Sequence, residues 1–268
     1  MANWKEFYLI RIEFLGFRYH GWQKQPNYRS VQGMVDKTFE FIFKNNNFKT
    51  FGSGRTDAKV SADDFAFELF LLDSLKIDYT TLVDELNRNL PSDIRAKCIS
   101  KVDSEFNIIH NSSEKEYHYY FSSGEKSHPF NAPLIRDFGA SLNIDKMQEA
   151  ASYFLGKHNF KRFASKPTEN AIFERVILKS EIIENKKITA NFTPNESYVY
   201  KVKSKGFLRY QVRLMVGALV NVGRGDWSLE QFQETLLNPN GLQIKNIAPS
   251  SGLVLHEVSF IDSQERVH

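Results

Sequence analysis

The order of strand-like and helix-like segments in the first hundred residues is the feature that most constrains the fold. Residues 7–14 alternate apolar and polar side chains, as a half-buried strand does. Residues 31–42 repeat apolar side chains at spacings of three and four, as an amphipathic helix does, and Ser30 is its expected N-cap. Further patterns indicate a strand ending near 51, a strand at 64–72, a helix at 81–90 and a strand at 94–102. This β-α-β-β-α-β order predicts a sheet with its helices on one side.

The second half of the chain repeats the same kinds of segment. Its patterns predict a strand at 117–121, a helix at 145–155, a hairpin over 182–192 and a strand at 198–205. The most regular helical stripe covers residues 208–220, and Gly223 and Gly225 end it. We therefore predict an α+β fold of two related domains, 1–105 and 106–268, each a mainly antiparallel sheet with helices packed on one side.

Composition narrows the class of protein. Of the 268 residues, 41% are hydrophobic and 25% are charged, which is the balance of a globular protein. The net charge of +3 permits an acidic partner such as RNA without requiring one. The single cysteine, Cys98, cannot form an internal disulfide. No signal-peptide pattern and no apolar run near the ~18 residues of a membrane span are present, so we expect a cytoplasmic location and no membrane partner.

The segment Gly52–Asp57 is the first candidate for chemistry. Its glycines allow a tight turn and the close approach of a ligand. Arg55 and Asp57 are two residues apart, so in an extended segment their side chains point the same way. A carboxylate held beside a permanent cation stays ionised, which a carboxylate nucleophile requires. The same spacing also fits an ordinary surface turn in which Asp57 caps or ion-pairs.

Basic and aromatic residues occur together in three regions. The basic groups are Arg18, His20, Lys24 and Arg29; Lys161, Arg162 and Lys166; and Lys201, Lys203, Lys205, Arg209 and Arg213. Positive charge binds phosphates, and aromatic rings stack on unpaired bases. A solvated basic surface with its aromatic rings turned inward fits the same pattern equally well.

No pattern indicates a cofactor or a metal. The glycine segment lacks the spacing of both phosphate-binding glycine motifs. The seven histidines include no pair at ligand spacing, and Cys98 stands alone. Arg213 lies off the apolar stripe of the helix at 208–220, and we expect Gly217, one turn later, to leave open space beside it. An arginine in such a place can reach a carboxylate across a cleft, or can simply lie on the exposed side of the helix.

Seven segments, in order along nearly the whole chain, resemble motifs of the tRNA pseudouridine synthase A family. They are Gly21–Pro26 with Val31–Gly33, Gly54–Ala58, Asn87–Ile94, Lys115–Tyr119, Gly156–Phe160, Phe207–Gly217 with Val222–Gly225, and Ala248–Leu255. The resemblance implies a homodimer of two-domain subunits, each with an RNA-binding cleft between its domains. It also implies an enzyme without cofactor or metal that isomerises uridine in the anticodon stem-loop of tRNA.

The same resemblance assigns roles to individual residues. Asp57 corresponds to the nucleophile, Tyr117 to the tyrosine that stacks on the flipped uracil, and Arg213 to the arginine that pairs with the aspartate. Arg55 helps to hold the base outside the stack, and Leu253 packs against its ring. As further RNA contacts we expect Trp22, Gln23, Lys24, Lys59, His158, Lys201, Lys203, Lys205 and Arg209.

Two segments depart from the family pattern. After Ala58 the family usually has Gly-Val-His-Ala, whereas this chain has Lys59-Val60-Ser61-Ala62. The family's Phe-His-Ala-Arg is replaced by residues 106–109, which read Phe-Asn-Ile-Ile. These changes leave open the same chemistry on another tRNA position or on rRNA, and a non-catalytic RNA-binding or chaperone protein is a further alternative. The sequence also leaves open whether Asp57 attacks C1′ or C6 of the nucleoside or acts as a base.

Overall fold

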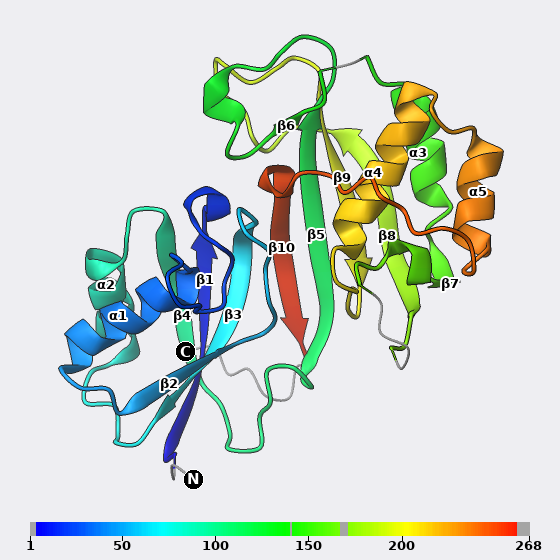
Figure 1. The fold of residues 1–268 in the computed structure, drawn as a ribbon. Helices are drawn as coiled ribbons and strands as arrows, with labels where there is room; N and C mark the ends of the chain where they lie inside the picture. The colour runs from blue at the N-terminus through cyan, green and yellow to red at the C-terminus, as the bar shows by residue number, and fades with distance from the viewer. Residues whose placement is uncertain (1–3, 140, 167–170, 262–268) are drawn as a thin grey trace. The chain divides into compact units, whose positions relative to one another are not determined.

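The computed structural model describes residues 4–139, 141–166 and 171–261, and it confirms the α+β class (Figure 1). The chain forms two compact units, Met1–Ser113 with Leu255–His268, and Glu114–Val254. The boundary therefore lies after the expected residue 105, and the last strand returns to the first unit. The reason is local packing, because Phe106 and Ile108 are buried against the first unit and the Phe106 ring lies 5.8 Å from that of Phe260.

The first unit has the β-α-β-β-α-β order that the sequence predicts. Its elements are β1 (Glu6–Phe14), α1 (Val31–Phe43), β2 (Phe48–Gly52), β3 (Ser61–Leu71), α2 (Tyr79–Asn89), β4 (Ile94–Lys101) and, from Leu255 onward, β10 (Leu253–Phe260). The strands lie in the order β4-β1-β3-β10, and β2 pairs with β3. Strand β1 is antiparallel to both of its neighbours. Figure 1 shows α1 and α2 together on one side of this sheet.

Local signals place the helices of this unit. Ser30 caps α1, because its hydroxyl accepts a hydrogen bond from the Gly33 amide at 3.2 Å. The helix α2 begins at Tyr79, earlier than the predicted residue 81, because Asp78 is its N-cap and its carboxylate accepts from the Thr81 amide at 2.9 Å. The alternating apolar residues of β1 are buried, as expected for the side of the sheet that meets the helices.

The second unit is also a mainly antiparallel sheet with helices. Its elements are β5 (Ser112–Ser122), β6 (Arg136–Asp137), α3 (Ile144–Ser152), β7 (Gly156–Asn159), β8 (Glu174–Glu184), β9 (Ser197–Ser204), α4 (Gln211–Arg224) and α5 (Leu229–Leu237). Short 3-10 helices cover Gly16–Arg18 in the first unit and Pro129–Asn131, Lys161–Phe163 and Ser250–Gly252 in the second. The strands lie in the order β5-β9-β8-β7, and β6 pairs in parallel with β5.

The predicted hairpin over 182–192 is wrong. Strand β8 ends at Glu184, and its antiparallel neighbour β9 begins only at Ser197. Asn185 is the reason, because its buried side chain accepts hydrogen bonds from the amides of Lys187 and Ile188 and donates to the Ile188 carbonyl. These contacts satisfy the backbone locally and replace a strand ladder.

In the described part of the chain, no helix is both long and apolar enough to cross a membrane.

Candidate functional site

The segment with Asp57 connects β2 to β3 and is held from behind by the buried Gly21-Trp22 pair. The Trp22 amide donates to the Thr56 hydroxyl at 3.0 Å. Gly21 has φ +83°, and a Cβ added there would lie 2.1 Å from the Thr56 carbonyl oxygen. Glycine is therefore required at position 21 by both its backbone conformation and the close approach of the loop.

Trp22 does not lie where an RNA contact would be. Its side chain is 2% exposed, and its ring packs on Phe65 and Phe67 at centroid distances of 4.4 and 5.4 Å. A buried indole offers no face to an RNA base. This position argues against the direct contact expected for Trp22 and gives it a role in supporting the loop.

Asp57 begins a tight turn. The Val60 amide donates to the Asp57 carbonyl at 3.2 Å, and the turn places Lys59 at φ +67°. Asp57 is half-buried, while Arg55 and Lys59 on either side are exposed. The half-buried Asp57 therefore lies, along the chain, between two exposed cationic residues.

Lys59, which stands where the family usually has glycine, has φ +67°, in the left-handed region that favours glycine. The left-handed conformation is costly for a residue with a side chain, by about 1 kcal/mol. Its amide donates to the Tyr19 carbonyl at 2.9 Å, and its Nζ lies 5.4 Å from the centre of the Phe17 ring. The substitution therefore preserves the turn and adds an exposed positive charge beside Asp57, which keeps Lys59 a candidate RNA contact.

Among the other departures from the family pattern, Ser61, Asn107 and Ile108 make contacts within the first unit, whereas Ile109 is 46% exposed. Ser61 is buried, and its hydroxyl accepts from the Gly16 amide at 2.9 Å. The Asn107 side chain accepts from the amides of Ile109 and His110, and Ile108 is 0% exposed. Residues 61, 107 and 108 thus stabilise the first unit, and of the changed side chains described here, Lys59 is the one that alters the charge beside Asp57.

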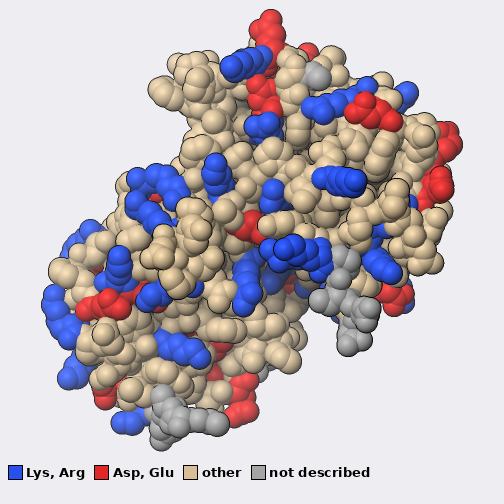
Figure 2. All heavy atoms as spheres, in the orientation of Figure 1, with Lys and Arg blue, Asp and Glu red and all other residues tan. Residues whose placement is uncertain are grey.

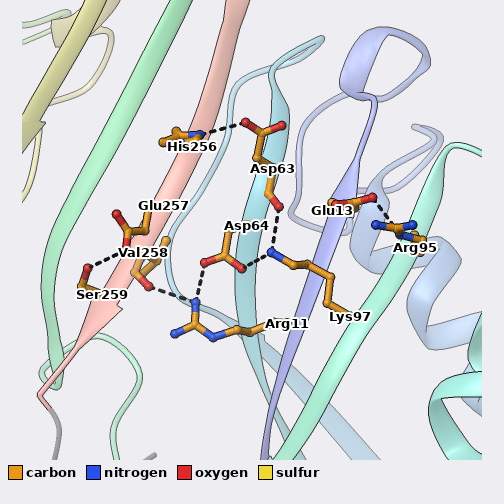
Figure 3. Close-up of polar contacts among 10 residues, drawn as sticks. All are labelled: Arg11, Glu13, Asp63, Asp64, Arg95, Lys97, His256, Glu257, Val258 and Ser259. Atoms are coloured by element: carbon orange, nitrogen blue, oxygen red, sulfur yellow. Dashed lines mark hydrogen bonds and ion pairs between the residues drawn. The ribbon is translucent and has the colours of Figure 1, made fainter. Parts of the chain in front are cut away.

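The two acidic residues that follow the loop have partners within the first unit (Figure 3). The Asp64 carboxylate pairs with Arg11 and with Lys97, the latter at 3.0 Å. The Asp63 carboxylate lies 2.9 Å from Nδ1 of His256, and the backbone carbonyl of Asp63 accepts a hydrogen bond from the Lys97 ammonium group. These carboxylates hold β1, β3, β4 and β10 together, so they are poor candidates for the catalytic group.

In the second unit, Tyr117 lies on β5 and is half-buried. Its ring meets that of Phe207 edge-on, with centroids 5.3 Å apart. Phe207 belongs to the segment that leads into α4, the helix that carries Arg213. The contact between Tyr117 and Phe207, which no sequence pattern predicts, joins β5 to the segment before α4.

Arg213 is tied to the chain segment before β10. Its Nε donates to the Ala248 carbonyl at 2.7 Å, and its own carbonyl accepts from the Ala248 amide at 3.1 Å. The expected open space beside Gly217 is filled, because a Cβ there would lie 1.9 Å from the Asn246 carbonyl oxygen. The glycine instead allows residues 246–248 to approach α4 closely enough to hold Arg213. The expected partner Asp57 belongs to the other unit, so that pairing stays a prediction.

Lys201 and Lys203 are on the opposite face of the sheet from Tyr117. The register pairs Tyr117 with Val202, and neighbours along a strand point to opposite faces. Lys203 also forms an ion pair with Glu114 at 2.8 Å. An RNA that stacks on Tyr117 approaches the other face, so this geometry argues against the RNA contacts expected for both lysines.

The remaining candidates differ in their surroundings. Gln23, Lys205 and Arg209 are exposed, and Lys24 is exposed but lies 3.3 Å from Asp36. Nε2 of His158 lies 2.9 Å from the Leu155 carbonyl oxygen. Leu253 is buried at the start of β10. None of these positions identifies a role by itself, and the roles stay predictions.

Arg162, from the second basic group, has a structural function. Its guanidinium donates to the carbonyls of Thr235 in the last turn of α5, of Asn238 at the C-cap and of Leu242 beyond the helix. This arginine therefore satisfies carbonyls that the helix end leaves unpaired. Other basic side chains are spread over the face drawn in Figure 2, on both units.

Two tyrosines near Arg213 had no individual role assigned from the sequence. Tyr210 caps α4, and its ring lies against Arg213, with 4.8 Å between the guanidinium carbon and the ring centre. The hydroxyl of Tyr119 donates to the Pro249 carbonyl at 2.8 Å, one residue after Ala248. Their aromatic character was visible, but nothing in the local pattern distinguishes a ring that holds an arginine from one in the core.

Comparisons with known proteins agree with the motif order. A family model described as tRNA pseudouridine synthase matches residues 150–261. The tRNA pseudouridine synthase A of Thermosipho melanesiensis is 35% identical over 257 residues, which cover 94% of this chain and 99% of that protein. The proteins of Thermosipho africanus (34% identical; 94% and 99% covered) and Bacillus cereus (28% identical; 93% and 96% covered) carry the names tRNA pseudouridine synthase A and A 1. These matches run through both units and confirm the resemblance: the chain belongs to the tRNA pseudouridine synthase A family.

Proposed function

We propose that this protein converts uridine to pseudouridine in the anticodon stem-loop of tRNA, with Asp57 as the nucleophile. The observation that carries the proposal is the loop itself. Its half-buried Asp57 is flanked along the chain by exposed Arg55 and Lys59, and Gly21 and Trp22 pack against the loop at Thr56. Membership of the tRNA pseudouridine synthase A family supplies the substrate class.

The reaction suits such a site. The N1–C1′ bond breaks, the base turns, a C5–C1′ bond forms, and the proton on C5 is finally lost to N1 or solvent. Nothing is oxidised or hydrolysed in this sequence. A carboxylate can bond covalently to the nucleoside while the base turns, and a site that excludes water protects this intermediate.

The target base must leave its stack before it can react. Unstacking costs a few kcal/mol, and stacking on an aromatic side chain offsets about 1–3 kcal/mol of that. We assign this stacking to Tyr117, whose ring is half-buried and braced edge-on by Phe207. Arg55 and Lys59 supply the positive charge that binds the neighbouring phosphates.

The tRNA target is favoured over rRNA by the names of the relatives, which are tRNA pseudouridine synthases. Ser61 and Ile108 are buried within the first unit, so the changes at these two positions do not alter the exposed surface, whereas Asn107 and Ile109 are exposed and neutral. We further propose that the working form is a homodimer, which sedimentation of the purified protein tests directly.

The test of the nucleophile is Asp57→Asn, with Asp84→Asn as the matched control. Asp84 is exposed on α2 in the same unit, so its substitution removes an equal charge away from the loop. We expect Asp57→Asn to abolish pseudouridine formation on tRNA while RNA affinity is retained, and Asp84→Asn to retain both. Full activity of Asp57→Asn would refute the assignment.

The test of the target is a map of pseudouridine in total RNA from cells with and without the gene. Loss confined to the anticodon arm of tRNA supports the proposal, whereas loss in rRNA refutes the tRNA target. Tyr117→Phe keeps the ring, so it separates stacking from any proton transfer by the phenol.

A further inference from the structure

Tyr210 has a backbone conformation that a bulky residue rarely adopts. It is the N-cap of α4 with φ 61° and ψ 8°, in the left-handed region that favours glycine, asparagine and aspartate. In the described residues, the other non-glycine positions with positive φ are occupied by asparagine or lysine, at Asn27, Lys44, Lys59 and Lys166. An aromatic ring at such a position requires a specific reason.

The surrounding contacts hold Tyr210 in this conformation. Gln211 is fully buried, and its side-chain oxygen accepts a hydrogen bond from the Leu208 backbone amide at 2.8 Å. The backbone amide of Gln211 donates to the Leu208 carbonyl at 3.0 Å. The Arg209 carbonyl accepts from the Ser165 amide at 3.0 Å. Both neighbours of Tyr210 are therefore fixed by hydrogen bonds, Gln211 across the turn to Leu208 and Arg209 from the distant Ser165.

The conformation places the Tyr210 ring against two guanidinium groups. The guanidinium carbon of Arg213 lies 4.8 Å from the ring centre, and that of Arg209 lies 5.2 Å away. Both distances are within the range of a cation–π contact. Arg213 is held a second time by its Nε, which donates to the Ala248 carbonyl.

We propose that Tyr210 is a positioning residue for Arg213. The ring supports the guanidinium plane and the Ala248 carbonyl fixes its Nε, so the remaining N–H groups keep one direction throughout the reaction. The left-handed backbone at Tyr210 makes this contact with Arg213 possible, because a helical or extended φ at this position would point the ring away from Arg213. This inference rests on the proposed role of Arg213 in the active site and adds a residue that orients it.

The test compares Tyr210→Asn with Tyr210→Phe. Asparagine tolerates the left-handed backbone but lacks the ring, whereas phenylalanine keeps the ring and loses only the hydroxyl. We expect Tyr210→Asn to lower kcat for pseudouridine formation by about 2- to 30-fold, the range of one cation–π contact. KM, RNA affinity and the melting temperature should stay at their wild-type values, and Tyr210→Phe should retain kcat.

A double-mutant cycle with Arg213→Gln shows whether Tyr210 acts through Arg213. Single-turnover rates at excess enzyme keep weak activity measurable. The loss caused by Tyr210→Asn should be smaller in the Arg213→Gln background. An unchanged loss in that background, a kcat for Tyr210→Phe as low as for Tyr210→Asn, or a loss matched by a lower melting temperature each overturns the inference.

The outcome also separates this inference from the proposed function. Wild-type activity of Arg213→Gln refutes the active-site role of Arg213 itself. A strong loss in Arg213→Gln together with wild-type kcat in Tyr210→Asn refutes only the positioning role.

Discussion

Glu68 is a buried carboxyl group whose ionisation should make the stability of the first unit depend on pH. It lies on β3 and is 3% exposed. Its Oε2 accepts from the Ile108 amide at 3.1 Å, and its Oε1 has no hydrogen-bond partner in the described part of the chain. Burial raises the pKa of Glu68 from 4.5 to about 7, although the Ile108 amide and the charge of Lys49 partly oppose the rise.

The size and sign of the effect follow from this pKa. The folded state holds the proton more tightly than the unfolded chain, so the group stabilises the fold below pH 4.5. This contribution is lost as the pH rises to about 7. At about 1.4 kcal/mol for each pKa unit, the loss amounts to about 3 kcal/mol. Above pH 7 the folded protein carries a buried negative charge.

The variant Glu68→Gln isolates this contribution, because glutamine keeps the shape and the acceptor for the Ile108 amide but cannot ionise. Urea unfolding at several pH values gives the free energy of unfolding of both proteins. The variant should gain about 2–3 kcal/mol relative to wild type between pH 5 and pH 8. A Glu68→Leu control, which leaves the Ile108 amide unpaired, should be less stable than Glu68→Gln by about 1–3 kcal/mol at every pH. A wild-type-minus-Gln difference that does not change with pH refutes the reasoning.

Three further substitutions test features of the site. Gly217→Ala places a Cβ 1.9 Å from the Asn246 carbonyl oxygen and should destabilise the protein by about 1–3 kcal/mol and lower kcat. The control Gly206→Ala, whose Cβ meets nothing within 4 Å, should change neither, and equal urea unfolding midpoints for the two variants contradict the packing argument. Lys59→Gly relieves the left-handed strain, so the free energy of unfolding should stay within about 1 kcal/mol of the wild-type value while tRNA affinity falls. Unchanged tRNA affinity at low salt rules out a contact between Lys59 and a phosphate. Arg162→Ala removes three hydrogen bonds to carbonyls and should lower the free energy of unfolding by about 2 kcal/mol while tRNA affinity is retained. Weaker tRNA binding with unchanged stability would instead assign Arg162 to RNA binding.

Much of the fold was predictable because its signals are local. The alternation in β1 and the Ser30 cap of α1 depend on residues within one turn or strand, and the structure confirms both. The hairpin prediction failed because the Asn185 side chain satisfies the backbone of its own turn, and periodicity does not reveal such contacts. Residues 106–113 were assigned to the second domain because nothing local shows that Ile108 is buried in the first unit.

By itself, the sequence determined the family and the residue types of the site. Ordered motifs are a property of the chain alone, so Asp57, Tyr117 and Arg213 could be predicted as site residues without a structure. Only the tertiary structure decided what each neighbouring side chain faces. It buries Trp22 behind the loop and turns Lys201 to the other face of the sheet from Tyr117. It also fills the space beside Gly217 and brings Tyr210 against Arg213. Burial and strand register depend on contacts between segments that are distant in the sequence. The residue type alone does not show whether a side chain lies in the core, on one face of the sheet or in the site.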